Sequence, residues 1–191
     1  MDELLLNYEK LEGWCPREKA LKMIEYINSD SVCVELGVFG GRSLLPIAIK
    51  AKNGNVTGID AWNINAALEG INAKEHVEWW KKIDYNHFYE YTKEQLKLYN
   101  CNHVKLLKMT SVAAIESFED NSIDFLHQDS NHSEEISCAE VLLYYNKVKQ
   151  NGIWVFDDTN WDTTVKAQKL LCDKGYKLLF DSGSWKIYKR C

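Results

Sequence analysis

The chain has 191 residues, of which 46% are hydrophobic and 27% are charged, a composition typical of one globular domain spanning 1–191. Its net charge of −5 argues against a general nucleic-acid-binding surface, which needs clustered basic side chains. No apolar run approaches the ~20 residues of a membrane span, and the start Met1-Asp2-Glu3 lacks the basic residues of a signal peptide. We therefore expect a cytoplasmic protein that binds neither nucleic acid nor a membrane.

The first 28 residues predict two helices, over 2–12 and 17–28, because their apolar residues recur at helical spacing. The sequence Trp14-Cys15-Pro16 separates them. Packing against a sheet is the simpler interpretation of this pair. The alternative is that the pair covers the edge of a cofactor site, or a partner subunit in a homo-oligomer.

The next stretch predicts a strand, a glycine turn, a helix and a second strand. An apolar strand over 32–36, containing Glu35, runs into three glycines: Gly37, Gly40 and Gly41. Ser43 then opens an apolar helix over 44–50, and the strand over 56–59 ends at Asp60. Glycines allow a backbone to approach a ligand closely, and an acidic residue about 20 positions later can accept hydrogen bonds from ribose hydroxyls. The pattern favours a pocket for an adenosine-bearing cofactor, although Asp60 could also be a simple turn residue.

The segment 61–100 is rich in aromatic residues and histidines, and we expect helices over 73–82 and 86–99 in it. An insertion of this length can form a helical lid over a site. Strands are then predicted over 103–107, 122–127, 153–156, 176–181 and 184–189, with helices ending at Phe118 and spanning 134–148 and 161–173. Alternating strands and helices predict a doubly wound α/β fold with a mainly parallel, seven-stranded sheet, helices on both faces and an antiparallel last hairpin.

Acidic residues follow the fourth and fifth predicted strands, at Asp129, Asp157 and Asp158. With strand order 3-2-1-4-5 they share one cleft with the glycine turn. Carboxylates packed closely need a cation or a proton between them, and oxygen ligands suit Mg²⁺, with Mn²⁺ or Ca²⁺ as alternatives. A metal here could activate a substrate hydroxyl, and His132 is placed to take its proton. Alternatively, both acidic segments could simply cap the helices that follow them.

At these residues the chain resembles the class I S-adenosylmethionine-dependent methyltransferases. The motifs that carry the resemblance are Glu35-Leu-Gly37-Val-Phe-Gly40-Gly41-Arg-Ser43, Gly58-Ile-Asp60-Ala-Trp62, Phe125-Leu-His-Gln-Asp129-Ser-Asn-His132 and Gly152-Ile-Trp-Val-Phe-Asp157-Asp158-Thr-Asn-Trp161. The last two look like the metal-dependent O-methyltransferase branch (the macrocin O-methyltransferase-like group, methyltransferase family 24), which includes macrolide-sugar and aminocoumarin-sugar enzymes. Relatives often have I-D-G-x-H or I-D-G-D where this chain has Gln128-Asp129-Ser130-Asn131.

The resemblance implies a Rossmann-like fold and a role for each matching residue. Gly37 and its neighbours would hold the methionine part of S-adenosylmethionine, and Asp60 the ribose. Ala61 and Trp62 would pack near the adenine, with Thr110 and Ser111 at its polar edge. Asp129, Asp157 and Asp158 would bind Mg²⁺, with His132 as the base because Asn131 cannot serve as a carboxylate.

The leading hypothesis from the sequence is a Mg²⁺-assisted O-methyltransferase acting on a hydroxyl of a small molecule, such as a sugar or a sugar-bearing metabolite. An NAD-binding oxidoreductase is a rival, disfavoured because the strict G-x-G-x-x-G is missing. A third alternative is a non-catalytic module that binds the cofactor or a metal.

Overall fold

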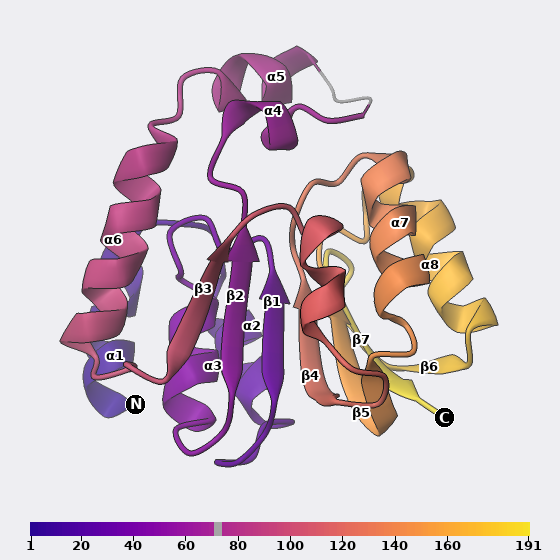
Figure 1. Cartoon of the computed structure of the whole chain (residues 1–191), viewed down its shortest axis with the longest axis horizontal. Coiled ribbons are helices and arrows are strands. Elements are labelled where there is room, and N and C mark those ends of the chain that lie inside the picture. The colour runs from indigo at the N-terminus through magenta and orange to yellow at the C-terminus, as the bar shows by residue number, and fades with distance from the viewer. Residues whose placement is uncertain (71–73) are drawn as a thin grey trace.

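Seven strands form one sheet in the order β3-β2-β1-β4-β5-β7-β6 (Figure 1). The computed structural model describes residues 1–70 and 74–191. The strands are β1 (Cys33–Leu36), β2 (Val56–Asp60), β3 (Val104–Lys108), β4 (Ile123–Gln128), β5 (Val148–Phe156), β6 (Tyr176–Asp181) and β7 (Lys186–Arg190). β1 to β5 run parallel, and β7 pairs antiparallel with both β5 and β6. The predicted fold class, including the antiparallel last hairpin, is confirmed.

Helices cover both faces of this sheet, as predicted. They are α1 (Asp2–Asn7), α2 (Arg17–Ile24), α3 (Leu44–Lys50), α4 (Ile64–Ala67), α5 (Lys74–Trp80), α6 (Tyr85–Leu98), α7 (Glu134–Tyr144) and α8 (Val165–Asp173), with 3₁₀ turns η1 (Tyr8–Lys10), η2 (Ala113–Ser117) and η3 (Asp162–Thr164). Successive strand residues face opposite sides, so the core has two parts. Phe125 packs in the part that includes α1, α2, α3 and α6 residues, and Leu126 packs in the part that includes α7 and α8 residues.

Several predicted helices are shorter in the structure. The helix expected over 17–28 ends at Ile24, and the one expected over 161–173 begins at Val165 after a 3₁₀ turn. The helix expected over 134–148 ends at Tyr144, and β5 begins at Val148 instead of residue 153. Val148 is fully buried and pairs with Ile123, and the pairing register then shifts before Ile153. The apolar residues at the start of β5 continue the helical spacing of α7. For this reason the sequence predicted a helix that was too long. The helix expected over 2–12 is also divided, into α1 and η1.

The segment 61–100 forms α4, α5 and α6, of which α4 was not predicted. The side chain of Asn63 caps α4 by accepting a hydrogen bond from the backbone N–H of Ala66 at 3.0 Å. Residue 73, the expected start of a helix, lies outside the described residues. α4 and α5 lie beyond the carboxyl ends of β1 and β2 (Figure 1). No helix in residues 1–70 and 74–191 combines the length and the apolar character needed to cross a membrane.

Candidate functional site

A cavity of about 640 Å³ lies at the carboxyl ends of the strands, within the size range of small-molecule sites. Ten of the predicted site residues line it: Gly37, Ser43, Asp60, Ala61, Thr110, Ser111, Asp129, His132, Asp157 and Asp158. The glycine turn and the acidic residues therefore share one cavity, as the predicted strand order requires. Glu35, Gly40, Gly41 and Trp62 are not among the residues that line it.

Gly37 allows the glycine turn to pack against the loop after β4. Its φ of +85° is one that residues with a side chain rarely adopt, and a Cβ here would lie 2.0 Å from the carbonyl oxygen of Asp129. Gly40 and Gly41 fit against other neighbours: a Cβ on Gly40 would meet the Glu12 carbonyl at 2.7 Å, and one on Gly41 would meet Thr92 at 3.1 Å. The first glycine thus shapes the cavity, whereas the other two allow the chain to pack behind it.

Asp60 stabilises the glycine turn with its carboxylate. Oδ2 accepts hydrogen bonds from the backbone N–H groups of Val38 at 3.1 Å and Phe39 at 2.9 Å, and Oδ1 accepts one from Trp62 at 2.7 Å. Burial raises the pKa of Asp60, and these three backbone hydrogen bonds oppose that rise. Asp60 also lines the cavity, so contact with a ribose stays a prediction.

Three non-glycine residues at the ends of β1, β2 and β5 have positive φ. They are Phe39 at 48°, Trp62 at 42° and Asp158 at 47°. Trp62 is buried, and its indole N–H donates a hydrogen bond to the Phe39 carbonyl at 2.9 Å. Such conformations cost free energy and persist only where surrounding contacts impose them, as at ligand sites.

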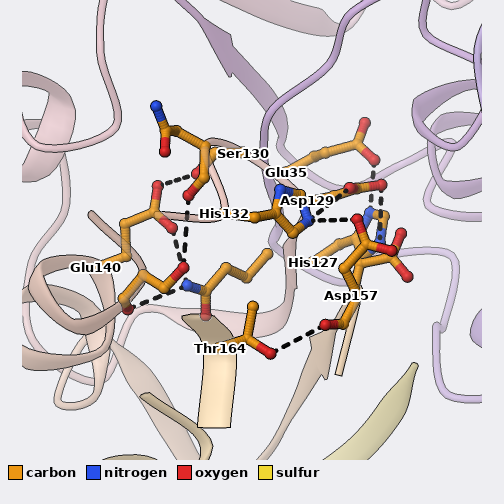
Figure 2. A network of polar contacts seen from close by, with 12 residues as sticks. Glu35, His127, Asp129, Ser130, His132, Glu140, Asp157 and Thr164 are labelled. Atoms are coloured by element: carbon orange, nitrogen blue, oxygen red, sulfur yellow. Dashed lines mark hydrogen bonds and ion pairs between the residues drawn. The ribbon is translucent and has the colours of Figure 1, made fainter. Parts of the chain in front are cut away.

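Glu35 does not line the cavity, and its carboxylate points to the ring of His127 (Figure 2). Its Oε1 lies 2.6 Å from Nδ1 of His127, and both side chains are fully buried. Burial lowers the pKa of His127, as does the charge of Lys19, so we assign a neutral ring that donates its Nδ1–H to Glu35. The His127 Nε2 atom then carries a lone pair and has no hydrogen-bond partner among the described residues.

A buried lysine neutralises the acidic cluster. Lys19, on α2, forms an ion pair with Oδ2 of Asp157 and lies 3.7 Å from Oδ2 of Asp129. Burial alone would lower the pKa of Lys19, but the two carboxylates raise it, so the side chain is a cation. Burial would raise the pKa of Asp157, but the positive charge of Lys19 holds this pKa below its ordinary value. The pKa of Asp129 is raised, by burial and by the charge of Asp157.

The predicted Mg²⁺ site is therefore not a simple set of three carboxylates. Ligand atoms of His127, Asp129 and Asp157 lie within 4.8 Å of one another, and Asp158 is not part of this group. A nitrogen donor suits Mg²⁺ poorly, and the Lys19 ammonium already contacts Oδ2 of Asp157 and would repel an ion bound beside it. In the arrangement that the structure shows, these residues do not fit a bound Mg²⁺.

His132 lies between two carboxylates at the cavity wall (Figure 2). Its Nε2 atom is 3.0 Å from Oδ2 of Asp158 and 3.6 Å from Oδ1 of Asp129, without the alignment of a hydrogen bond. The ring packs 5.2 Å from that of Trp161. Neighbouring Asn131 has a structural role, because its amide donates to backbone carbonyls of α4 and its flank, including Ala66 at 2.9 Å.

A second buried carboxyl group, Glu140 on α7, supports the loop that carries Asp129 (Figure 2). The hydroxyl of Ser130 donates to its Oε1, and Nε2 of Gln128 donates to its Oε2 at 2.8 Å. Burial raises the pKa of Glu140 from 4.5 to about 7, although hydrogen bonds from Ser111, Ser130 and Gln128 oppose the rise. Glu140 is fully buried, and the sequence analysis did not identify it.

Aromatic side chains from three segments form one wall of the cavity. Trp14 stacks on Phe39 of the glycine turn at 4.9 Å between ring centroids, and its ring lies 4.7 Å from that of Trp79 on α5. Trp80 packs edge-on against Phe39 at 6.1 Å. Aromatic residues of the segment 61–100, which was predicted to form a lid, thus line the site. Trp14 of the N-terminal segment lines it as well.

Lys19 and Trp14 are functional candidates that sequence reasoning missed. Lysine is normally solvent-exposed, so a lysine in a predicted amphipathic helix does not by itself indicate a buried functional residue. One signal was available, because Lys19 precedes Ala20 and lies four positions before Met23, on the face that α2 buries. A lysine on the buried face of a helix needs a carboxylate partner, and the closely packed carboxylates of the acidic cluster need a cation. Together these two requirements could have indicated the pairing.

Comparisons with known proteins are consistent with this geometry. A family model described as a methyltransferase domain matches residues 34–159, more than half of the chain. An S-adenosylmethionine-dependent O-methyltransferase from Thermotoga maritima has a similar structure, with a TM-score of 0.67, 10% identity and coverage of 98% of this chain and 71% of that one. No curated protein matches the sequence significantly.

Proteins described as acting on other acceptors share the same fold. An rRNA methylase from Streptococcus thermophilus has a TM-score of 0.62 at 9% identity, covering 93% of this chain and 99% of that one. A precorrin-6y C5,15-methyltransferase from Geobacter metallireducens has a TM-score of 0.62 at 15% identity, with coverages of 95% and 90%. Identities this low show the fold alone, and none of these proteins supports the NAD-binding alternative.

Proposed function

This chain belongs to the methyltransferase family, as a class I S-adenosylmethionine-dependent enzyme, and we propose that it methylates a hydroxyl oxygen of a small molecule. The observation that carries this proposal is the position of His132 in the same cavity as the glycine turn and Asp60. The cavity is lined by the glycine turn at Gly37 and by the carboxylate of Asp60, which can accept hydrogen bonds from ribose hydroxyls, and this supports the cofactor.

When bound, S-adenosylmethionine supplies a methyl group activated by its sulfonium, so that the S–CH₃ bond breaks with its electron pair left on sulfur as the new C–O bond forms. The protein must orient the acceptor oxygen and remove its proton. In our proposal Nε2 of His132 takes this proton. The carboxylate of Asp158, whose Oδ2 lies 3.0 Å from this atom, stabilises the imidazolium that results.

The lining of the cavity favours an acceptor with both flat apolar surface and hydroxyl groups. Trp14, Trp79 and Trp80 offer aromatic faces, and Asp158 and His132 offer polar atoms. A sugar ring combines apolar C–H faces, which can pack on aromatic rings, with hydroxyl groups, which can form hydrogen bonds with these polar side chains. We therefore propose a sugar or a sugar-bearing metabolite as the acceptor.

The Mg²⁺ requirement expected from the sequence is not part of this proposal. Asp129 and Asp157 do lie together, which supports it, but the Lys19 ammonium contacts the same oxygens. Ion and ammonium would compete for one position, so we derive no step of the reaction through a metal.

Isothermal titration with S-adenosylmethionine tests the cofactor part of the proposal. We expect saturable binding, with NAD as a control that produces no heat. Failure to bind S-adenosylmethionine and its demethylated product would contradict the proposal.

A transfer assay tests the acceptor class. The protein is incubated with S-adenosylmethionine that carries a labelled methyl group and a panel of hydroxylated small molecules that includes sugars. We expect label in an ether linkage of at least one sugar compound. Cofactor binding with no transfer to any member would instead indicate a non-catalytic module.

A further inference from the structure

The ammonium group of Lys19 lies where a divalent ion was expected. It contacts Asp157 and is 3.7 Å from Asp129, and the side chain is only 1% exposed. In the part of the chain that the structure describes, these two carboxylates are its ion-pair partners. One fixed positive charge therefore bridges the loops that follow β4 and β5.

Helix α2 prevents this charge from leaving the site. Lys19 shares the buried face of α2 with Ala20 and Met23, which are 1% and 0% exposed. The segment before the helix is also held in place, because Cys15 is buried and Trp14 stacks on Phe39. These contacts fix the helix that carries Lys19, and the buried side chain reaches the two carboxylates from the core side.

A divalent ion held by His127, Asp129 and Asp157 would lie beside the same two carboxylates that Lys19 contacts. Mg²⁺ binds carboxylate oxygens directly at about 2.0–2.1 Å, which leaves no room for an ammonium group on the same oxygen. The two cations would also repel each other in a region with little water, where charges are poorly screened. The observed position of Lys19 thus excludes an ion bound to Oδ2 of Asp157, and charge repulsion opposes an ion bound to the other oxygens of the group.

We propose that Lys19 takes the place of the divalent ion, so that this chain transfers methyl groups without a metal. The inference rests on the proposed methyl transfer and adds how its site is held together. Lys19 is a positioning residue, because it acts through Asp129, whose Oδ1 atom lies 3.6 Å from Nε2 of His132.

The test is a titration with Mn²⁺. Binding is measured as the loss of the free-ion signal in electron paramagnetic resonance. The wild-type protein should take up no Mn²⁺ at this site. Removing the ammonium in Lys19→Ala should create a site, with Mn²⁺ bound about tenfold more tightly or better than by wild type. A purely structural role for Lys19 would not produce this gain of metal binding.

Three variants control the titration. Lys19→Arg keeps the positive charge and should behave as wild type, and so should Lys22→Ala, which alters a more exposed lysine of the same helix. The double variant Lys19→Ala/Asp157→Asn should lose the Mn²⁺ site. If Lys19→Ala does not fold, Lys19→Met retains an apolar stem without the charge and is used in its place.

The proposal is overturned if wild-type protein binds Mn²⁺ and Asp157→Asn abolishes that binding, or if folded variants without the ammonium gain no binding. Should neither variant fold, the wild-type titration decides: uptake that Asp157→Asn abolishes overturns the proposal, and the lack of such uptake supports it. None of these measurements uses the cofactor. A failure to bind S-adenosylmethionine would therefore count against the methyltransferase proposal and leave the metal titration interpretable.

Once an acceptor is identified, chelation gives a second test. The rate of S-adenosylhomocysteine formation by wild type should not change when EDTA is added. Loss of the rate in EDTA, with recovery on addition of Mg²⁺, would overturn the inference.

Discussion

Oε1 of Glu35 lies 2.6 Å from Nδ1 of His127, and no part of either side chain reaches solvent. The two residues come from neighbouring strands, where Glu35 pairs in register with His127. The contact sets the orientation of an imidazole whose other nitrogen faces Asp129 at 3.8 Å. It therefore connects the first strand of the fold to the acidic side of the cavity.

We expect Glu35→Leu to lower the free energy of unfolding by about 3 kcal/mol, because the buried N–H of His127 would lose its acceptor. Glu35→Gln retains an acceptor oxygen and should lose only about 1 kcal/mol. Urea denaturation measures both. The control is Glu12→Gln, which alters a largely exposed Glu–His pair and should change stability by about 0.5 kcal/mol or less. Equal losses for Glu35→Leu and Glu12→Gln would show that burial of the pair is not decisive.

Gly37→Ala should destabilise the protein by about 3 kcal/mol or more and abolish cofactor binding, because a methyl group would overlap the Asp129 backbone. The control is Gly183→Ala. Gly183 also has a positive φ, of +93°, but its added Cβ would have no neighbour within 4 Å, so only about 1 kcal/mol should be lost. Thermal denaturation and titration with S-adenosylmethionine check both variants. Normal cofactor affinity in Gly37→Ala would refute the close packing of these two loops.

Glu140 should make stability depend on pH. Its pKa is about 7 in the folded state against an ordinary value of 4.5, so between these values the folded protein holds a proton that the unfolded chain releases. As the pH rises from 4.5 to 7, the free energy of unfolding of the wild type should therefore fall, relative to Glu140→Gln, by about 1.4 kcal/mol for each pH unit. Urea denaturation of both proteins at several pH values measures this. A difference that does not vary with pH would mean that Glu140 has no raised pKa.

His132→Ala should slow methyl transfer by about 10² to 10⁴-fold, the usual contribution of a general base. Affinity for S-adenosylmethionine should stay within twofold, because the change removes no part of the glycine turn. Formation of S-adenosylhomocysteine measures the rate, and calorimetry measures the affinity. His103→Gln is the control, since His103 contacts the Ala48 carbonyl near the opposite end of the sheet. An unchanged rate in His132→Ala would remove this residue from the mechanism.

Much of the fold could be read from local patterns. The predicted helix over 44–50 matches α3 because an apolar run begins directly after the glycine turn and ends at a lysine. The start of β5 could not be read, because Val148 continues the helical period of α7 while pairing with Ile123. α4 was missed because its four residues are too few to show a period, and its start depends on the Asn63 cap.

The site was predictable where topology alone brings residues together. Parallel strands end at one edge of the sheet, so Asp60, Asp129 and Asp157 could be placed at one cavity from the strand order. Lys19 reaches the same cavity from outside the sheet, and no strand order predicts that. Its burial depends on how α2 docks, which is a property of tertiary packing.

The contact between Lys19 and Asp157 joins residues 138 positions apart. During synthesis, Lys19 leaves the ribosome long before the end of β5 does. The ion pair with Asp157 therefore cannot form until most of the chain has been made. Contacts between such distant residues form slowly, because a long stretch of chain must be ordered first. A nascent or truncated chain that ends before Asp157 can therefore contain the whole glycine turn and still lack the acidic side of the cavity.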